Sequence, residues 1–145
     1  MRCRVLQHAK RKERGFTLIE LLVVLAILAM LAGLVGPRVM NQLGGAKSKT
    51  AALQISDFEQ GVEMYKLDVG RFPSTDEGLE ALVSQPSNAT GWNGPYLRKS
   101  QIPQDPWGRD YNYRMPGQHG DFDIFTLGED NAPGGSGESA DITNW

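Results

Sequence analysis

Gly15-Phe16-Thr17-Leu18-Ile19-Glu20 opens an apolar run that continues to Val35, and this stretch decides how the chain folds. Glu20 is the only charged residue between Phe16 and Val35. A helix of about 20 residues rises about 30 Å, which matches the hydrocarbon core of a bilayer. We therefore predict a transmembrane helix segment over residues 16–36.

The charges on the two sides of this segment are unequal. Residues 1–15 carry six of the 15 basic residues and one of the 17 acids, which leaves nine basic and 16 acidic residues for the rest. A basic segment ahead of a membrane helix predicts a cytoplasmic N-terminus and an outward-facing C-terminal body. The acidic body argues against nucleic acid as a partner, because phosphate binding requires a basic face.

The position of the apolar run also distinguishes two kinds of leader. A secretory signal peptide would have an A-x-A-like cleavage site after the run, but Gly36-Pro37-Arg38 and a further helical pattern follow it. The small residue Gly15 precedes the run instead. We therefore predict that residues 1–15 form a basic leader peptide that is cleaved off. Cys3, the only cysteine, lies in this leader, so no intramolecular disulfide is expected.

Beyond Pro37, apolar residues recur at helical spacing with charged residues between them. We expect Pro37 to loosen the helix, since proline lacks an N–H and crowds the preceding turn. The pattern predicts one long helix from about Phe16 to Leu67, ended by a left-handed cap at Gly70, with its second half packed on a small domain over residues 37–145. The repeating positions are Leu43, Ala46, Thr50, Leu53, Phe58, Val62 and Tyr65.

The small domain is expected to make the fold class α+β. Ser74 and Glu77 have the spacing of a capping box, which predicts a short helix over residues 76–83. Alternating residues predict strands over 111–115 and 121–127, paired as a hairpin. The other expected segments are a turn over residues 116–120, a loop over 85–93, and a coil rich in glycine and acids over 128–139.

The tract from Gly15 to Glu20 resembles the leader junction of type IV pilins and of type II secretion pseudopilins. In proteins of this kind a membrane-embedded prepilin peptidase cuts after the glycine on the cytoplasmic face. The resemblance implies cleavage between Gly15 and Phe16, followed by methylation of the new N-terminal amine of Phe16.

Glu20 can be interpreted in two ways. A carboxylate about one helical turn into a bilayer costs about 2.5–3.5 kcal/mol on insertion scales. Glu20 is either a tolerated residue that reaches back to water, or it binds a cation during assembly. The cleaved amine of Phe16 in a neighbouring subunit is cationic near neutral pH, with a reference pKa of about 7.7–8.0, and suits the second interpretation. One head-to-tail contact of this kind, repeated without closure, builds a helical homopolymer.

Short tracts throughout the body together resemble the major pseudopilin of type II secretion, the general secretion pathway protein G family. The resemblance implies a structural subunit of a periplasmic filament that drives export of folded exoproteins. It implies a single-pass protein of the bacterial inner membrane, with minor pseudopilins and other inner-membrane secretion components as partners. The tracts are Tyr65–Asp68, Gly70–Pro73, Gly78–Val83, Gly94–Leu97, Asp105–Gly108, Phe122–Ile124 and Leu127–Asp130.

Two other functions remain open at this stage. One is a type IV pilin for adhesion, motility or DNA uptake, and the other is a membrane-tethered binding module that never polymerises. Catalysis is not expected, because His119 is the one histidine after the leader and no phosphate loop or zinc spacing is present.

The coil near the C-terminus is the one candidate site for a small ligand. It contains hard oxygen ligands of the kind that Ca²⁺ prefers, without the spacing of an EF-hand. Composition alone favours a disordered acidic loop over a metal site. The family resemblance implies one bound calcium ion, with ligands that carry over to the Leu127 carbonyl, Asp130, the Ala132 carbonyl, Ser136 and Asp141.

Overall fold

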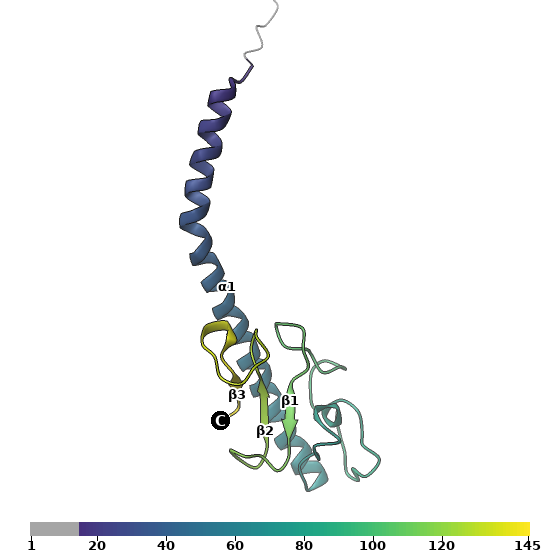
Figure 1. Cartoon of the computed structure of the whole chain (residues 1–145). Helices are drawn as coiled ribbons and strands as arrows, with labels where there is room; N and C mark the ends of the chain where they lie inside the picture. Colours follow the sequence, from purple (N-terminus) through teal and green to yellow (C-terminus); the bar gives the residue numbers. More distant parts are fainter. Residues whose placement is uncertain (1–14) are drawn as a thin grey trace, which may run out of the picture. The chain divides into compact units, whose positions relative to one another are not determined.

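The computed structural model describes residues 15–145, so the leader predicted for residues 1–15, with Cys3, lies outside the described residues except for Gly15. The chain divides into two compact units, residues 1–39 and 40–145. The secondary structure is α+β, as predicted. Its elements are α1 (Leu18–Val69), η1 (Leu79–Leu82), β1 (Asn112–Arg114), β2 (Asp123–Thr126), η2 (Gly137–Ser139) and β3 (Ile142–Thr143) (Figure 1).

Helix α1 is a single element of 52 residues, close to the predicted range of 16–67. It begins after Thr17, whose hydroxyl accepts a hydrogen bond from the Glu20 N–H. It ends where Gly70 adopts φ 81° and donates its N–H to the Lys66 carbonyl at 2.8 Å, which is the predicted left-handed cap. The helix runs through Pro37 without interruption, although we expected this residue to loosen it.

The core of residues 40–145 forms around one stripe of α1. Ile55, Phe58, Val62 and Tyr65 are all buried and recur at helical spacing. They pack in one hydrophobic cluster with residues of the following segments, namely Phe72, Leu79, Leu82, Tyr111, Phe122 and Ile124. Ala46, Thr50 and Leu53, which we placed on the packed face, are exposed, so that part of the prediction is wrong. They lie off the stripe, because the buried hydrophobic residues described on α1 are at positions 51, 55, 58, 62 and 65.

The capping box forms, but the helix after it differs from the prediction. The Ser74 N–H donates to Oε2 of Glu77 at 2.8 Å, and the Glu77 N–H donates to the Ser74 hydroxyl at 3.2 Å. Instead of an α-helix over residues 76–83, a turn is followed by the 3₁₀-helix η1 over four residues. The reason is Gly78, whose φ of 58° no right-handed helix accommodates.

The three strands form an antiparallel sheet in the order β1-β2-β3, and Figure 1 shows it beside the C-terminal half of α1. The predicted hairpin is present, with Asn112 opposite Phe125 and Arg114 opposite Asp123, although both strands are shorter than expected. Strand β3 was not predicted, because two residues are too few for a recognisable alternation. Asn144 extends its pairing, since the side-chain oxygen accepts the Ile124 N–H and the backbone N–H donates to the Ile124 carbonyl.

Candidate functional site: the N-terminal junction and the C-terminal loop

The predicted cleavage junction precedes α1. Gly15, Phe16 and Thr17 lie outside any helix or strand, and the Phe16 side chain is 86% exposed. A Cβ built on Gly15 would meet no atom of the described residues within 4 Å. An exposed peptide bond outside any helix or strand is accessible to a protease.

Glu20 is the third residue of α1 and lies in the first helical turn. Its carboxylate is exposed and takes part in no ion pair among residues 15–145. A negative charge in the first turn interacts favourably with the helix dipole. The sequence Thr17-Leu18-Ile19-Glu20 is also half of a capping box, because Thr17 accepts the backbone N–H of Glu20 at 3.3 Å. This cap uses only the backbone of Glu20, so it leaves the carboxylate free for another partner.

The predicted calcium ligands lie in a folded loop, which we call the C-terminal loop and define as residues 128–141. Its two ends are joined by a hydrogen bond from the Glu129 N–H to the Glu138 carbonyl at 2.9 Å. Asp130 Oδ1 accepts the Ala132 N–H at 3.1 Å, and Asp141 Oδ2 accepts the Gly134 N–H at 2.9 Å. Hydrogen bonds thus link four of the predicted ligand residues to the loop, because the carbonyl of the exposed Ser136 accepts the Ser139 N–H at 3.2 Å. The side chain of Ser136, the N-cap residue of η2, does not cap that helix.

One observation fits a cation in this loop. Oδ1 of Asp141 is buried and has no hydrogen-bond partner in the described part of the chain, so a carboxylate oxygen is left open. An ion is one way to compensate such an oxygen. The acidic ligands are few, since no group of three or more His, Cys, Asp or Glu side chains suited to a metal occurs among residues 15–145. A calcium ion here would depend mainly on carbonyl oxygens, which Ca²⁺ accepts.

Arg109 supports the start of the C-terminal loop, and sequence reasoning missed it. Its guanidinium donates to the carbonyls of Gly128 and Glu129. Its own N–H is held by the buried carboxylate of Asp105 at 2.9 Å, which also accepts the hydroxyl of Thr126. The tract Asp105-Pro106-Trp107-Gly108 therefore fixes the base from which Arg109 reaches the loop. A charged residue directly after a Pro-Trp-Gly turn was the only available signal.

His119 packs against the C-terminal residue and the hairpin turn. Its ring stacks on Trp145 with a centroid distance of 3.9 Å, and Nδ1 lies 3.3 Å from Oδ2 of the buried Asp123. Burial raises the pKa of Asp123, but the N–H groups of Gln118 and His119 and the His119 ring outweigh this effect, so the pKa lies below its usual value. No serine hydroxyl is hydrogen-bonded to His119 in the described chain. These groups hold the hairpin turn together.

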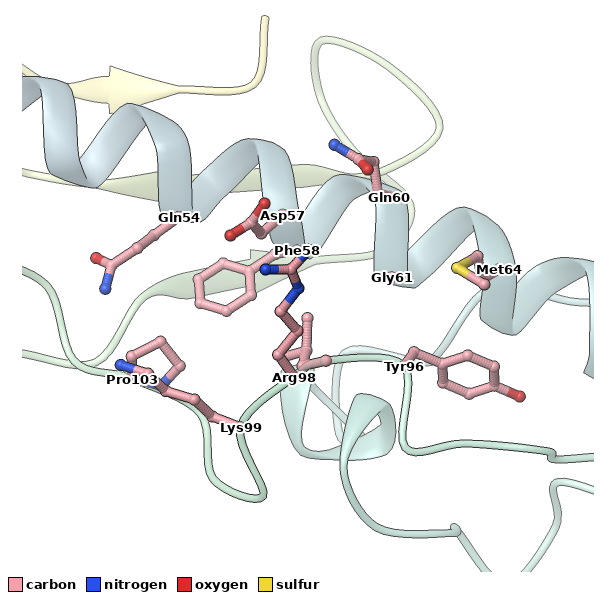
Figure 2. Close-up of a pocket in the computed structure, with 11 residues that line it drawn as sticks. Gln54, Asp57, Phe58, Gln60, Gly61, Met64, Tyr96, Arg98, Lys99 and Pro103 are labelled. Atoms are coloured by element: carbon pink, nitrogen blue, oxygen red, sulfur yellow. The ribbon is translucent and has the colours of Figure 1, made fainter.

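A surface groove lies between α1 and the segment after Tyr96 (Figure 2). Its volume is about 450 Å³. Figure 2 shows Arg98 reaching across it toward the helix beside Asp57 and Phe58. Its charged lining residues are Asp57 on α1 and Arg98 and Lys99 on the facing segment.

The fold and the junction define a class of protein. A long apolar helix that follows a prepilin-type junction directly, and whose second half forms the core of a small α+β domain, is the architecture of pilin-like subunits. Within α1, the described residues include a stretch long and apolar enough to cross a membrane.

Comparisons with known proteins identify the family. The family model described as "Type II secretion system (T2SS), protein G" matches residues 38–145, and the model "Prokaryotic N-terminal methylation motif" matches residues 10–36. The chain therefore belongs to the protein G family of the type II secretion system, as the sequence tracts predicted. The methylation motif and the apolar helix fit a membrane-anchored pseudopilin.

Individual relatives agree with this assignment. The chain is 46% identical over 138 residues to the type II secretion system core protein G of Vibrio cholerae serotype O1, covering 93% of each chain. It is 46% identical over 140 residues to the core protein G of Pseudomonas aeruginosa, covering 94% of this chain and 97% of that one. The crystal structure of the major pseudopilin from enterohaemorrhagic Escherichia coli matches with a TM-score of 0.63 and 37% identity, covering 73% of this chain and 88% of that one. These matches do not favour the type IV pilin alternative.

Proposed function

We propose that this chain is made as a precursor and becomes the repeating subunit of a type II secretion pseudopilus. A prepilin peptidase removes residues 1–15 and methylates Phe16, and the protein waits in the inner membrane with residues 16–36 as its transmembrane segment. The N-terminus is cytoplasmic and residues 37–145 are periplasmic. The observation that carries the proposal is the protein G match over residues 38–145 directly after a methylation motif over residues 10–36.

Intact-mass measurement with N-terminal fragmentation tests the processing step. The chain is co-expressed with a prepilin peptidase and purified from membranes. The expected product starts at Phe16 and carries one additional methyl group. A Gly15→Val variant serves as the control and stays uncut, because a β-branched side chain at the cleaved bond blocks access. A product that starts after Val35 would contradict the proposal.

In the mature filament, the Glu20 carboxylate of one subunit pairs with the Phe16 amine of the next. This pairing offsets the cost of a charge in the membrane only on assembly, and it fixes the axial register between subunits. The exposed carboxylate and the backbone-only cap at Thr17 support this role. Partners that act on the growing filament are the minor pseudopilins and inner-membrane components of the secretion system.

Substitution of Glu20 separates pairing from helix formation. Glu20→Ala and Glu20→Gln both retain the backbone N–H that Thr17 caps, so both are expected to insert and be cleaved normally. Both remove the charge and are expected to reduce the yield of filaments by at least about tenfold, the effect of roughly 1.4 kcal/mol. Sheared filaments are quantified by immunoblot. Normal assembly of both variants would refute the pairing.

We also propose that the function involves no catalysis by this chain. The stacking of His119 on Trp145 supports a structural role for this histidine. A filament subunit works through its contacts with identical copies, which require an ordered surface rather than a reactive group.

We further propose that the C-terminal loop binds one calcium ion through Asp130, Asp141, Ser136 and the carbonyls of Leu127 and Ala132. The ion would link oxygen atoms from both ends of the loop, in a domain that has no cysteine. The open Oδ1 of Asp141 supports this proposal. Asp130→Ala is expected to lower the melting temperature in calcium and to have little effect in chelator. If the wild type and Asp130→Ala melt at the same temperature in both buffers, the proposed calcium site is refuted.

A further inference from the structure

The side chain of Glu138 joins the C-terminal loop to α1. A Cβ built on Gly44 would overlap Cγ, Cδ and Oε1 of Glu138, so this side chain lies directly against the helix backbone, in a recess that alanine would fill by forcing the side chain to shift. The carboxylate also lies 3.9 Å from Nζ of Lys47. Because an exposed ion pair of this length contributes little, the recess at Gly44 is the more important part of the contact.

The next glycine of the helix differs in this respect. Gly44 is buried, whereas Gly45 is exposed, and a Cβ built on Gly45 would meet no atom of the described residues within 4 Å. The sequence pair Gly44-Gly45 thus contains one glycine that the loop requires and one that it does not. Alanine has the same effect on helix propensity at both positions.

Contacts within the loop connect Glu138 to the predicted calcium ligands. The Glu138 carbonyl accepts a hydrogen bond of 2.9 Å from the N–H of Glu129, and Glu129 is the residue before Asp130. A Cβ on Gly128, whose φ is 66°, would lie 2.7 Å from the same carbonyl oxygen, so the two ends of the loop are in close contact. Asp141 follows three residues later and is held by the Gly134 N–H. A displacement of the Glu138 backbone would therefore disturb both ends of the loop.

We propose that Glu138 is a positioning residue, which fastens the C-terminal loop to α1 by lying in the recess at Gly44. The inference rests on the proposed calcium site in one respect: a loop fastened in this way holds Asp141 and the Leu127 carbonyl ready for the ion. Because the contact uses only protein atoms, it holds the loop in the metal-free protein too. A ligand that binds an already ordered loop loses less conformational entropy, so the contact raises calcium affinity.

Hydrogen–deuterium exchange of the full chain in detergent micelles with chelator tests the contact directly. Gly44→Ala is expected to accelerate exchange of the backbone amides in residues 128–141 by about tenfold or more, because local opening becomes easier. Gly45→Ala, the matched control, is expected to leave the same amides within about twofold of the wild type. Equal exchange in the two variants would overturn the proposal.

Variants of Glu138 separate the contact from a general loss of stability. Glu138→Ala is expected to accelerate exchange as Gly44→Ala does, whereas Glu138→Gln, which keeps the shape, is expected to restore most of the protection. The double variant Gly44→Ala/Glu138→Ala is expected to show no further acceleration, because both changes remove one contact. Additive effects, or Glu138→Gln as severe as Glu138→Ala, would contradict the proposal.

Calorimetric titration with calcium distinguishes this inference from the calcium proposal. Gly44→Ala is expected to weaken calcium binding several-fold relative to Gly45→Ala. If no variant and not even the wild type binds calcium, the calcium site is refuted, and the exchange experiment still decides whether Glu138 fastens the loop. If all bind calcium equally while exchange differs, the link between contact and ion is refuted.

Discussion

The substitution Glu77→Gln tests the polar anchor that follows α1. Glu77 accepts two hydrogen bonds of 2.6 Å from the guanidinium of Arg71 and one of 2.8 Å from the Ser74 N–H. These contacts lower the pKa of Glu77 to about 2, with the hydrogen bonds from Arg71 as the largest cause. Glutamine keeps the size of the side chain and one oxygen acceptor but removes the charge.

The magnitude follows from the pKa shift. A change from 4.5 to about 2 corresponds to about 3 kcal/mol, at 1.36 kcal/mol per pKa unit. The Arg71 side chain is 38% exposed, so water screens the pair, and we expect Glu77→Gln to lower the free energy of unfolding by about 1–2 kcal/mol at pH 7. Because the folded pKa is the lower one, this contribution is complete above about pH 5. It declines as the pH falls and is lost near pH 2.

The difference in the free energy of unfolding is measured by urea unfolding of the full chain in detergent micelles, with tryptophan fluorescence as the probe. All three tryptophans, Trp92, Trp107 and Trp145, lie in residues 40–145, so the signal reports on that unit. Glu80→Gln is the matched control, since Glu80 is exposed and makes no side-chain hydrogen bond within the described chain. A difference between wild type and Glu77→Gln that is the same at pH 7 and pH 3 would refute the ion-pair argument.

Three further predictions concern the same unit and the same unfolding measurement. The Tyr65 hydroxyl is buried and neither accepts nor donates a hydrogen bond in the described chain, so we expect Tyr65→Phe to leave the free energy of unfolding unchanged or to raise it. Tyr113 donates to a carbonyl at 2.8 Å, so Tyr113→Phe is expected to cost about 1–2 kcal/mol, and equal effects of the two changes would be contrary evidence. Leu82→Ala in the core is expected to cost about 2–5 kcal/mol, whereas Leu53→Ala on the exposed face should stay within about 0.5 kcal/mol. Gly70→Ala is expected to cost about 1 kcal/mol, because φ is 81° there, and an unchanged midpoint would show that the cap tolerates a side chain.

The parts of the fold that depend on neighbouring residues were accessible from the sequence. The apolar run after Gly15, the cap at Gly70 and the hairpin around residues 116–120 all follow from local pattern, and the structure has the helix, the cap and the hairpin. The capping box of Ser74 and Glu77 also formed as predicted. The α-helix predicted after the capping box is absent because Gly78 takes a positive φ, and the presence of a glycine in the sequence does not reveal the sign of its φ.

The candidate site divides in a similar way. Gly15, Phe16 and Glu20 follow one another in a recognisable motif, so their roles could be proposed from the sequence. The contacts that hold the C-terminal loop join residues that are far apart in the chain. Arg109 reaches Gly128 and Glu129 over about 20 positions, and Glu138 lies on Gly44 over more than 90. No short window of sequence contains both members of such a pair.

The sequence by itself determined the long apolar helix, the prepilin-type junction, the α+β class and the protein G family, because each depends on consecutive residues or on the order of short tracts. Only the tertiary structure decided which face of α1 is buried, where Leu53 points, that β3 completes the sheet, and which residues fasten the C-terminal loop. The physical reason is that burial and long-range hydrogen bonds depend on the whole packed domain. Local propensity is fixed by a few adjacent side chains, whereas the Glu138 contact exists only once the loop and the helix are folded together.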